Sequence, residues 1–214
     1  MGLGISVGEL AALAESDPEG VEWMEEGFAA ANAVLTEAGL PEHVEPRQLP
    51  ALDSRAQLDS LPYSFIHYLR RAYARRKADP SWIATPSPKD EEPEEDEALQ
   101  AEYDAMNSHL ICHSDAEGYY LPVDFSEVLF AESADSDLPG GMLGSSYRLM
   151  EELLLVAPAL GIKLDNDQLS DSEAERISKV AQEEDGCYRE LESWILLYEC
   201  ARLSLQYKTA IVFS

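Results

Sequence analysis

Residues 109–125, HLICHSDAEGYYLPVDF, are the stretch around which the fold of the chain is expected to form. Residues 109–113 are mostly apolar and tolerate an extended backbone, which predicts a short strand. Residues 114–118 favour a turn, because Ser and Asp bond neighbouring backbone groups and Gly accepts a positive φ. Residues 119–125 predict a returning strand, which Pro122 places at a sheet edge or ends early. The stretch therefore predicts a β-hairpin.

This hairpin concentrates polar side chains that could form a site. His109 and His113 share one face of the predicted strand, but four residues at roughly 3.3 Å each separate them by about 13 Å, too far for one metal ion. His113 and Asp115 lie two residues apart, so the turn can bring imidazole and carboxylate together. We interpret this pair first as a structural anchor and second as part of an acid–base site. The sequence offers no third ligand, and we expect neither a metal nor a cofactor.

Composition favours one domain over residues 1–214. The chain has 214 residues, of which 45% are hydrophobic, and this is enough for a substantial core. Residues 79–97 carry four prolines and end in a run of acids, which predicts a solvated, flexible loop. The sequence shows no apolar run of about 18 residues and no secretory signal. Cys112, Cys187 and Cys200 have no close spacing, so we expect free thiols and a cytoplasmic location.

The charge balance narrows the choice of partners. There are 42 acidic and 15 basic residues, and the formal net charge is −27. Phosphate contacts need clustered Lys and Arg, so direct binding to nucleic acid or to an anionic membrane is not expected. A basic protein is the expected partner, because complementary charge accelerates association. Solubility and adaptation to salt are the alternative explanations of the charge.

Several helices can be predicted from their ends and from their apolar spacing. Asp17 as N-cap and Pro18 at the first position begin a helix that stops at Gly39. A second helix, from Pro62 to about Lys77, ends in five basic residues that either pair with the chain's own acids or bind an anion. Further helices are predicted after the Gly- and Ser-rich residues 139–146, after the capping box at Ser170, and from about Cys187 to Gln206.

The C-terminal residues complete the predicted fold. Residues 209–213 predict a buried strand, which we place beside the strand at 109–113. The fold class is therefore α+β: a helix-dominated single domain with a small antiparallel or mixed sheet of about three strands, packed against a layer of helices.

Three segments carry a resemblance to a known family: residues 1–8 (MGLGISVG), 113–125 (HSDAEGYYLPVDF) and 140–149 (GGMLGSSYRL). Together they resemble an uncharacterised family of acidic bacterial proteins with an H-S-D-x-E-G-Y-Y-x-P core, over nearly the whole chain. Small acidic proteins of this kind look similar to immunity proteins that neutralise toxins. The resemblance implies no residue roles.

Two functions of different classes follow. The first is a non-enzymatic, cytoplasmic protein-binding module, in its most specific form an immunity-like inhibitor of a basic partner. The second is a small hydrolase or ligand-binding protein with a polar site at residues 109–119. We assign no catalytic residues. A third possibility is a homo-oligomer with a purely structural role, and the sequence leaves the oligomeric state open. The candidate ligand-binding residues are His113, Asp115, Glu117, Tyr119, Arg70 and Arg71.

Overall fold

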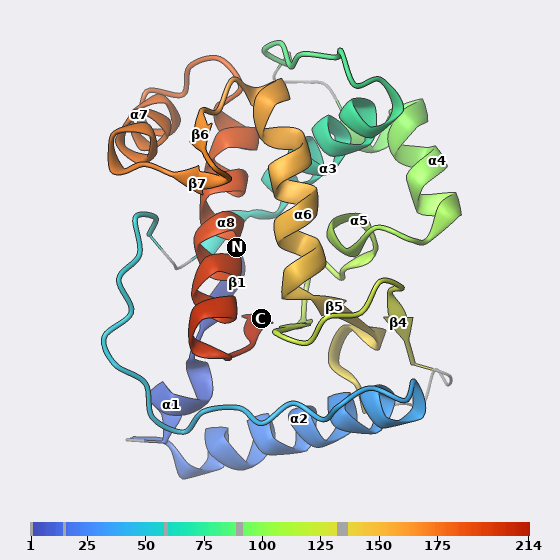
Figure 1. Ribbon diagram of the computed structural model, residues 1–214, viewed down its shortest axis with the longest axis vertical. Helices are drawn as coiled ribbons and strands as arrows, with labels where there is room; N and C mark the ends of the chain where they lie inside the picture. Colours follow the sequence, from blue (N-terminus) through green and yellow to red (C-terminus); the bar gives the residue numbers. More distant parts are fainter. Residues whose placement is uncertain (1, 15, 58–59, 89–91, 132–136) are drawn as a thin grey trace.

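A mixed six-stranded sheet lies between two layers of helices in the computed structural model, which describes residues 2–14, 16–57, 60–88, 92–131 and 137–214 (Figure 1). The strand order is β2-β1-β8-β3-β5-β4, and only β3 and β5 run parallel. The strands of this sheet are β1 (Gly2–Val7), β2 (Ser60–Pro62), β3 (Gly118–Leu121), β4 (Leu129–Phe130), β5 (Met142–Ser145) and β8 (Ile211–Phe213). The fold is thus α+β and rich in helix.

The larger helical layer covers one face of the sheet, and a smaller one covers the other (Figure 1). The larger layer contains α3 (Tyr63–Ala78), α4 (Glu97–Ala105), α5 (His109–Cys112), α6 (Ser146–Val156), α7 (Asp171–Gln182) and α8 (Tyr188–Tyr207). The smaller layer consists of α1 (Glu9–Leu13) and α2 (Pro18–Glu37). Short elements complete the described chain: η1 (Pro93–Glu95), η2 (Pro139–Gly141), η3 (Ala157–Leu160) and the β6 (Leu164–Asp165) and β7 (Gln168–Leu169) pair.

Side chains of the central strands alternate between the two layers, as strand geometry requires. On β3, Tyr120 enters the core beneath α3, α6 and α8, whereas Tyr119 enters the core beneath α2. On the neighbouring β8, Ile211 joins the first core and Val212 the second. Each core therefore depends on one face of the same strands.

The predictions for α2 and α7 are confirmed at their N-termini. The Asp17 carboxylate accepts a hydrogen bond from the Gly20 N–H at 3.1 Å, and Pro18 is the first residue of α2. The Ser170 hydroxyl accepts from the Glu173 N–H at 3.2 Å, which is the expected cap of α7. Helix α8 is buried around most of its circumference, as its apolar sequence indicates.

The predicted hairpin is wrong, and so is the sheet of about three strands. Residues 109–112 form α5, because the Ser108 side chain caps it and the buried Glu152 carboxylate accepts from the backbone N–H groups of His109, at 2.9 Å, and Leu110, at 2.6 Å. The strand at the C-terminus pairs with β3 and β1 instead. A distant carboxylate thus decides the conformation of residues whose local pattern favours a strand.

Two further segments account for the missing strands. Residues 2–7 form β1, a strand that the sequence did not predict, and the Gly- and Ser-rich residues before α6 contain β5. Part of the predicted loop at 79–97 falls on residues 89–91, which lie outside the described residues. Beyond them, η1 follows, and the Asp96 side chain caps α4. None of the described helices is long and apolar enough to cross a membrane.

Candidate functional site

Arg70 lies at the centre of the predicted polar site, with its side chain buried on α3. Its Nε donates to the carbonyl oxygen of Leu110 at 2.9 Å, and its Nη2 donates to that of His113 at 2.6 Å. Its Nη1 donates to the carboxylate of Asp115. These three bonds attach the end of α5 and the following turn to α3, so Arg70 stabilises the fold.

Asp115 binds two side chains of α3, Arg70 and His67, whose Nε2 lies 3.0 Å from Asp115 Oδ2. Burial disfavours the charged carboxylate, but the hydrogen bonds and charges of His67 and Arg70 outweigh burial and lower the pKa of Asp115 to about 2. The histidine partner of Asp115 is thus His67, which was not among the predicted residues. Its position three residues before Arg70, on the same helical face, was the available signal.

His113 is a neutral, buried ring. It stacks on Tyr120 with ring centroids 4.2 Å apart, and Phe213 contacts it at 4.3 Å. Its Nδ1 lies 2.8 Å from the carbonyl oxygen of Ser114, which fixes Nδ1 as the protonated nitrogen. Burial lowers the pKa of His113 to about 4, so the ring carries no charge at neutral pH. This environment is typical of a core histidine.

Tyr119 and Glu117 lie away from this cluster. Tyr119 points through the opposite face of the sheet and stacks on Phe28 of α2 at 5.0 Å. Burial, reinforced by nearby carboxylates, raises the pKa of its hydroxyl to about 12. Glu117 is exposed in the turn before β3. Arg70, His113 and Asp115 do line one small pocket, whereas Tyr119 lies on the other side of the sheet.

The basic end of α3 pairs with the protein's own groups. The Arg71 guanidinium contacts the Ser87 hydroxyl and lies 3.8 Å from the Glu190 carboxylate. Arg75 bonds Asp96 at 2.6 Å, and Lys77 bonds Glu102 at 2.7 Å. This arrangement supports internal pairing, the first of the two interpretations of the cluster. The described residues also contain no group of three or more His, Cys, Asp or Glu side chains placed to hold a metal ion.

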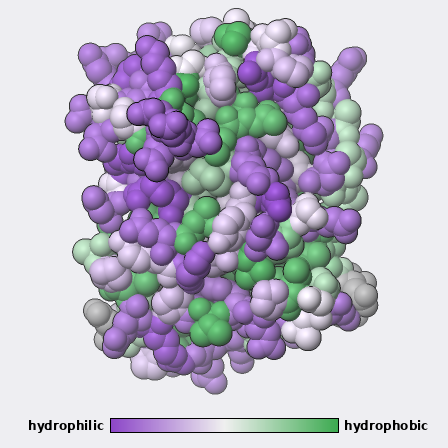
Figure 2. Space-filling model, viewed as in Figure 1, coloured by the Kyte–Doolittle hydropathy of each residue, from purple (hydrophilic) through white to green (hydrophobic). Residues whose placement is uncertain are grey.

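Elsewhere, six more of the described basic residues pair with acids of the chain, whereas Arg76 and Lys208 bond the Trp82 carbonyl oxygen and the Tyr147 hydroxyl. Pairing inside the molecule leaves the excess of carboxylates at the surface, and hydrophilic side chains cover most of the face seen in Figure 2. The remaining described pairs include Arg47–Glu25, Arg55–Glu199, Arg148–Asp124, Arg176–Glu173, Lys179–Glu183 and Arg202–Glu199.

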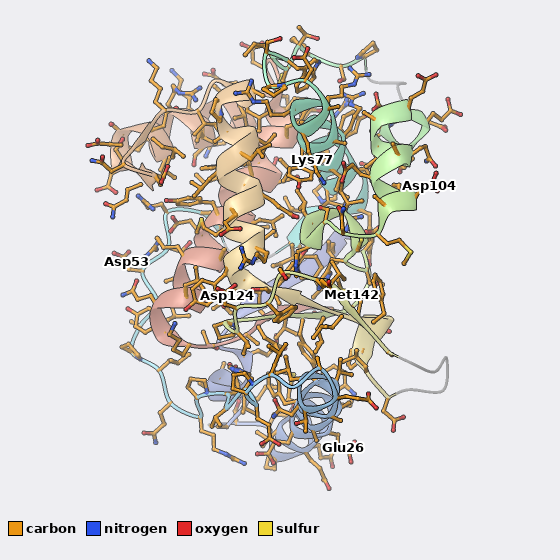
Figure 3. All side chains as sticks on the ribbon, turned by 45° about the vertical axis from the view of Figure 1, so that its right-hand side comes forward. Glu26, Asp53, Lys77, Asp104, Asp124 and Met142 are labelled. Atoms are coloured by element: carbon orange, nitrogen blue, oxygen red, sulfur yellow. The ribbon has the colours of Figure 1, made fainter. Side chains whose placement is uncertain are left out.

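The N-terminal layer carries a strongly one-sided charge, as does the longer stretch without Lys or Arg at residues 90–147. Residues 1–46 contain ten acids and no Lys or Arg. Five of these acids are exposed between positions 17 and 26, at the start of α2: Asp17, Glu19, Glu22, Glu25 and Glu26. Figure 3 shows α2 at one end of the molecule, with the labelled Glu26 pointing outward. Sequence reasoning treated α2 only as a core helix, although the absence of bases before Arg47 was visible.

The spacing of these carboxylates, which we call the α2 acidic face, is comparable to that of phosphates. Ten residues span about 15 Å, which gives one carboxylate per roughly 3 Å of axis, or one per about 4 Å when Glu25, which pairs with Arg47, is left out. One strand of duplex DNA carries a phosphate every 3.4 Å or so. The exposed Trp23, with 54% of its surface accessible, lies among the acids. The inner side of α2 is fixed by Met24, Phe28, Ala31 and Leu35, so the face is rigid.

An acidic protein with most of its described bases paired internally and a negative face on a well-packed helix has the features of proteins that present charge to a partner. The chain matches, over residues 1–213, the model of a family described as "Putative DNA-mimic protein". The chain therefore belongs to this family. No curated protein and no solved structure matches it.

This membership agrees with the expected family of uncharacterised acidic proteins and with a protein-binding role. It also corrects the expectation about partners. A basic protein partner and no direct binding to nucleic acid were expected, whereas the description of the family links its members to DNA through mimicry. Charge alone could not reveal this link, because an acidic surface attracts any basic partner.

Proposed function

We propose that the protein is a DNA mimic that occupies the DNA-contacting surface of DNA-binding proteins. The observation that carries the proposal is the α2 acidic face, a rigid row of carboxylates at the density of one DNA strand in a chain of net charge −27. Lys and Arg side chains that contact phosphates would contact these carboxylates instead. Such a function needs no catalytic group.

The surface beside the α2 acidic face suits the same role. A shallow groove continues along the C-terminal half of α2, lined by Ala29, Asn32, Ala33, Thr36, Glu37 and Glu42. Small side chains on its floor leave room for long basic side chains, and the two glutamates supply negative charge at its edge. Trp23 offers an aromatic surface on which an Arg guanidinium can stack. The charge of α2 is thus concentrated in its first half, and Glu37 and Glu42 extend it at the far end of the groove.

Immunity-like inhibition is the narrower form of this proposal. In that form the partner is a toxin that binds or cuts DNA, and occupying its DNA site neutralises it. A bacterial cytoplasm is the proposed location, since Cys112, Cys187 and Cys200 are free thiols, as suits a reducing compartment.

Competition with DNA tests the proposal. A fluorescent 20-base-pair duplex is bound to purified bacterial DNA-binding proteins, namely a nucleoid protein, a helix-turn-helix repressor and a nuclease. Release of the duplex on adding this protein is followed by anisotropy. We expect release from at least one of them. No release from any of the three would contradict the proposal for these classes.

A matched pair of variants tests whether the α2 acidic face is responsible. The first carries Glu19→Gln, Glu22→Gln and Glu26→Gln, and the second carries the exposed changes Glu175→Gln, Glu183→Gln and Asp165→Asn. Each removes three negative charges. At about 0.5–1 kcal/mol per contact, the first should weaken competition by roughly ten- to a hundredfold and the second by less than about threefold. Equal losses would show that bulk charge, and not this face, binds the partner.

A further inference from the structure

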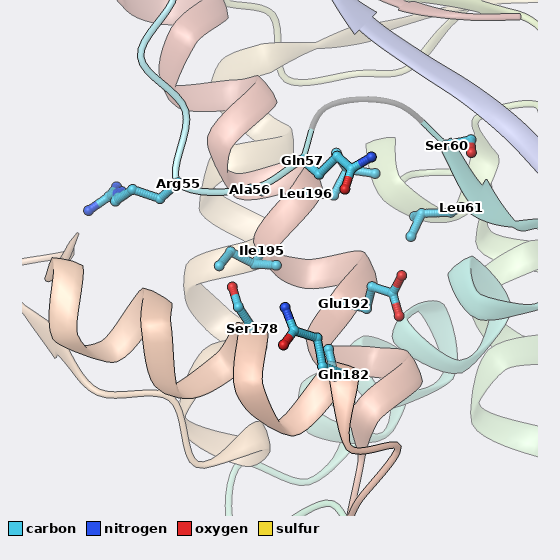
Figure 4. A pocket seen from close by; sticks show the side chains of 11 residues that line it. Arg55, Ala56, Gln57, Ser60, Leu61, Ser178, Gln182, Glu192, Ile195 and Leu196 are labelled. Atoms are coloured by element: carbon cyan, nitrogen blue, oxygen red, sulfur yellow. The ribbon is translucent and has the colours of Figure 1, made fainter.

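A pocket of about 520 Å³ lies between α7, α8, residues 55–57 and the start of β2 (Figure 4). Its size is in the range of small-molecule sites. Ser178, Ala181 and Gln182 line it from one face of α7, and Glu192, Ile195 and Leu196 line it from one face of α8. Arg55, Ala56, Gln57, Ser60 and Leu61 complete the wall.

Of the two charged residues that line this pocket, Arg55 has hydrogen-bond partners and Glu192 has none among the described residues. The Arg55 guanidinium bonds the buried Glu199 carboxylate at 2.6 Å and the carbonyl oxygen of Leu169, and in Figure 4 it points away from the other lining side chains. Glu192 is half-buried and forms no hydrogen bond or ion pair with the described residues. The uncompensated charge of the pocket is therefore negative.

The environment of Glu192 favours a cation over an anion. Burial, with the nearby Glu184 carboxylate, raises the pKa of Glu192, which means that its negative charge is poorly compensated. The net charge of −27 also repels anions from every surface. The floor of the pocket, formed by Leu61, Ile195 and Leu196, suits an alkyl chain, and the Ser178 hydroxyl and Gln182 amide can accept from N–H donors.

We propose that this pocket binds an aliphatic cation, a guanidinium or ammonium group on an alkyl stem, with the head group on the Glu192 carboxylate and the stem on Leu61, Ile195 and Leu196. Such a group occurs in a free amine and in an Arg or Lys side chain of a bound protein. The proposal does not rest on DNA mimicry, since the pocket shares no residue with the α2 acidic face.

Calorimetric titration of the intact protein tests the site with three probes. Agmatine represents a free amine, N-acetyl-arginine amide represents a protein side chain, and N-acetyl-citrulline amide has the shape of the latter without its charge. We expect saturable one-to-one binding of at least one cationic probe and none of the citrulline compound. Tighter agmatine binding indicates a free amine as the natural source, and tighter arginine amide binding indicates a side chain. Equal binding of the citrulline compound would overturn the proposal.

Three variants test where the cationic probe binds, and two of them remove one negative charge each. Glu192→Gln should weaken the binding of the cationic probe by about tenfold or more, as expected for loss of a charge-assisted hydrogen bond. Glu175→Gln, on the exposed face of α7, removes one charge elsewhere and should leave affinity within about twofold. Ala181→Phe fills the pocket without changing charge and should also abolish binding. Equal weakening by Glu192→Gln and Glu175→Gln, or full binding by Ala181→Phe, would refute the site.

Discussion

Gly27 determines how closely α2 lies on the sheet, and its replacement by Ala tests the placement of the acidic face. A Cβ at Gly27 would overlap the hydroxyl of Tyr119 and lie 3.2 Å from its Cζ and 3.4 Å from its Cε2. Tyr119 is buried and stacks on Phe28, so its ring cannot move aside without disturbing the core beneath α2.

The expected magnitude follows from two opposing effects. Ala stabilises a helix interior by about 1 kcal/mol relative to Gly. Overpacking costs about 1–3 kcal/mol and takes the upper part of this range here, because backbone and ring would overlap. Gly27→Ala should therefore lower the unfolding free energy by about 1–2 kcal/mol. Tyr119→Phe removes a buried hydroxyl that has no partner among the described residues, so alone it should be neutral or stabilising by up to about 1 kcal/mol.

The double variant supplies the decisive measurement. Without the hydroxyl, the added methyl group meets only the ring at ordinary to tight contact distance, and the stability should return to that of the wild type or above it. Urea denaturation followed by circular dichroism gives the four free energies of the cycle and a coupling of about 2 kcal/mol. Ala33→Gly, at an exposed position of α2, calibrates the helix effect. If Gly27→Ala is stabilising whether or not Tyr119 keeps its hydroxyl, α2 does not lie on Tyr119 as described.

Four further predictions concern buried ionisable groups and salt. Arg70→Met should lower the unfolding free energy by about 3–5 kcal/mol in urea denaturation, because two carbonyl oxygens lose their partner and Asp115 keeps only His67, whereas Arg76→Met should lower it by less than about 1 kcal/mol; similar values would contradict the role of Arg70. The pKa of His113 is lowered to about 4 in the folded state, so the unfolded state alone takes up a proton as the pH falls from 6.5 to 4, and the wild type loses stability over that range. The unfolding free energy of His113→Gln should therefore rise by up to about 3 kcal/mol relative to that of the wild type between pH 6.5 and 4. Burial raises the pKa of Glu152 to about 7, so the stability that Glu152 contributes is complete below pH 4.5 and is lost as the pH rises to 7. The unfolding free energy of Glu152→Gln should rise relative to that of the wild type over the same range. For either variant, a plot of unfolding free energy against pH that runs parallel to the wild type would refute the pKa assignment. Finally, duplex DNA loses affinity for its protein steeply with added salt through counterion release. The α2 acidic face has about the charge density of one strand and not of two, so its affinity for the same protein should fall less. Competition should therefore improve from 50 to 200 mM salt in the anisotropy assay, and a decline would argue against binding through this face.

Helix ends were predictable because their signals are local. Asp17, Pro18 and Ser170 bond or constrain groups within a few residues, and the structure places each as expected. The sheet was not predictable to the same degree: the C-terminal strand was predicted, but β1 and its pairing with β8, about two hundred residues away, were not. Long-range pairing decides such segments.

Which of the candidate polar residues lie together was also only partly predictable, for a related reason. Strand alternation sends Tyr119 and Tyr120 to opposite layers, and α5 replaces the strand that would have aligned His109 with His113. Arg70 and Asp115 do come together, but His67 completes their contact. Sequence therefore identified the residue types of the cluster without its true histidine. The charge asymmetry of residues 1–46, in contrast, required no structure to be seen.

The inner and outer sides of α2 perform separate tasks. Met24, Phe28 and Leu35 hold the helix to the sheet, while the glutamates on its outer side contribute nothing to that attachment. Substitutions on the outer side can therefore change the pattern of negative charge with little effect on folding. Such a helix lets recognition diverge from one partner to another while the scaffold stays constant.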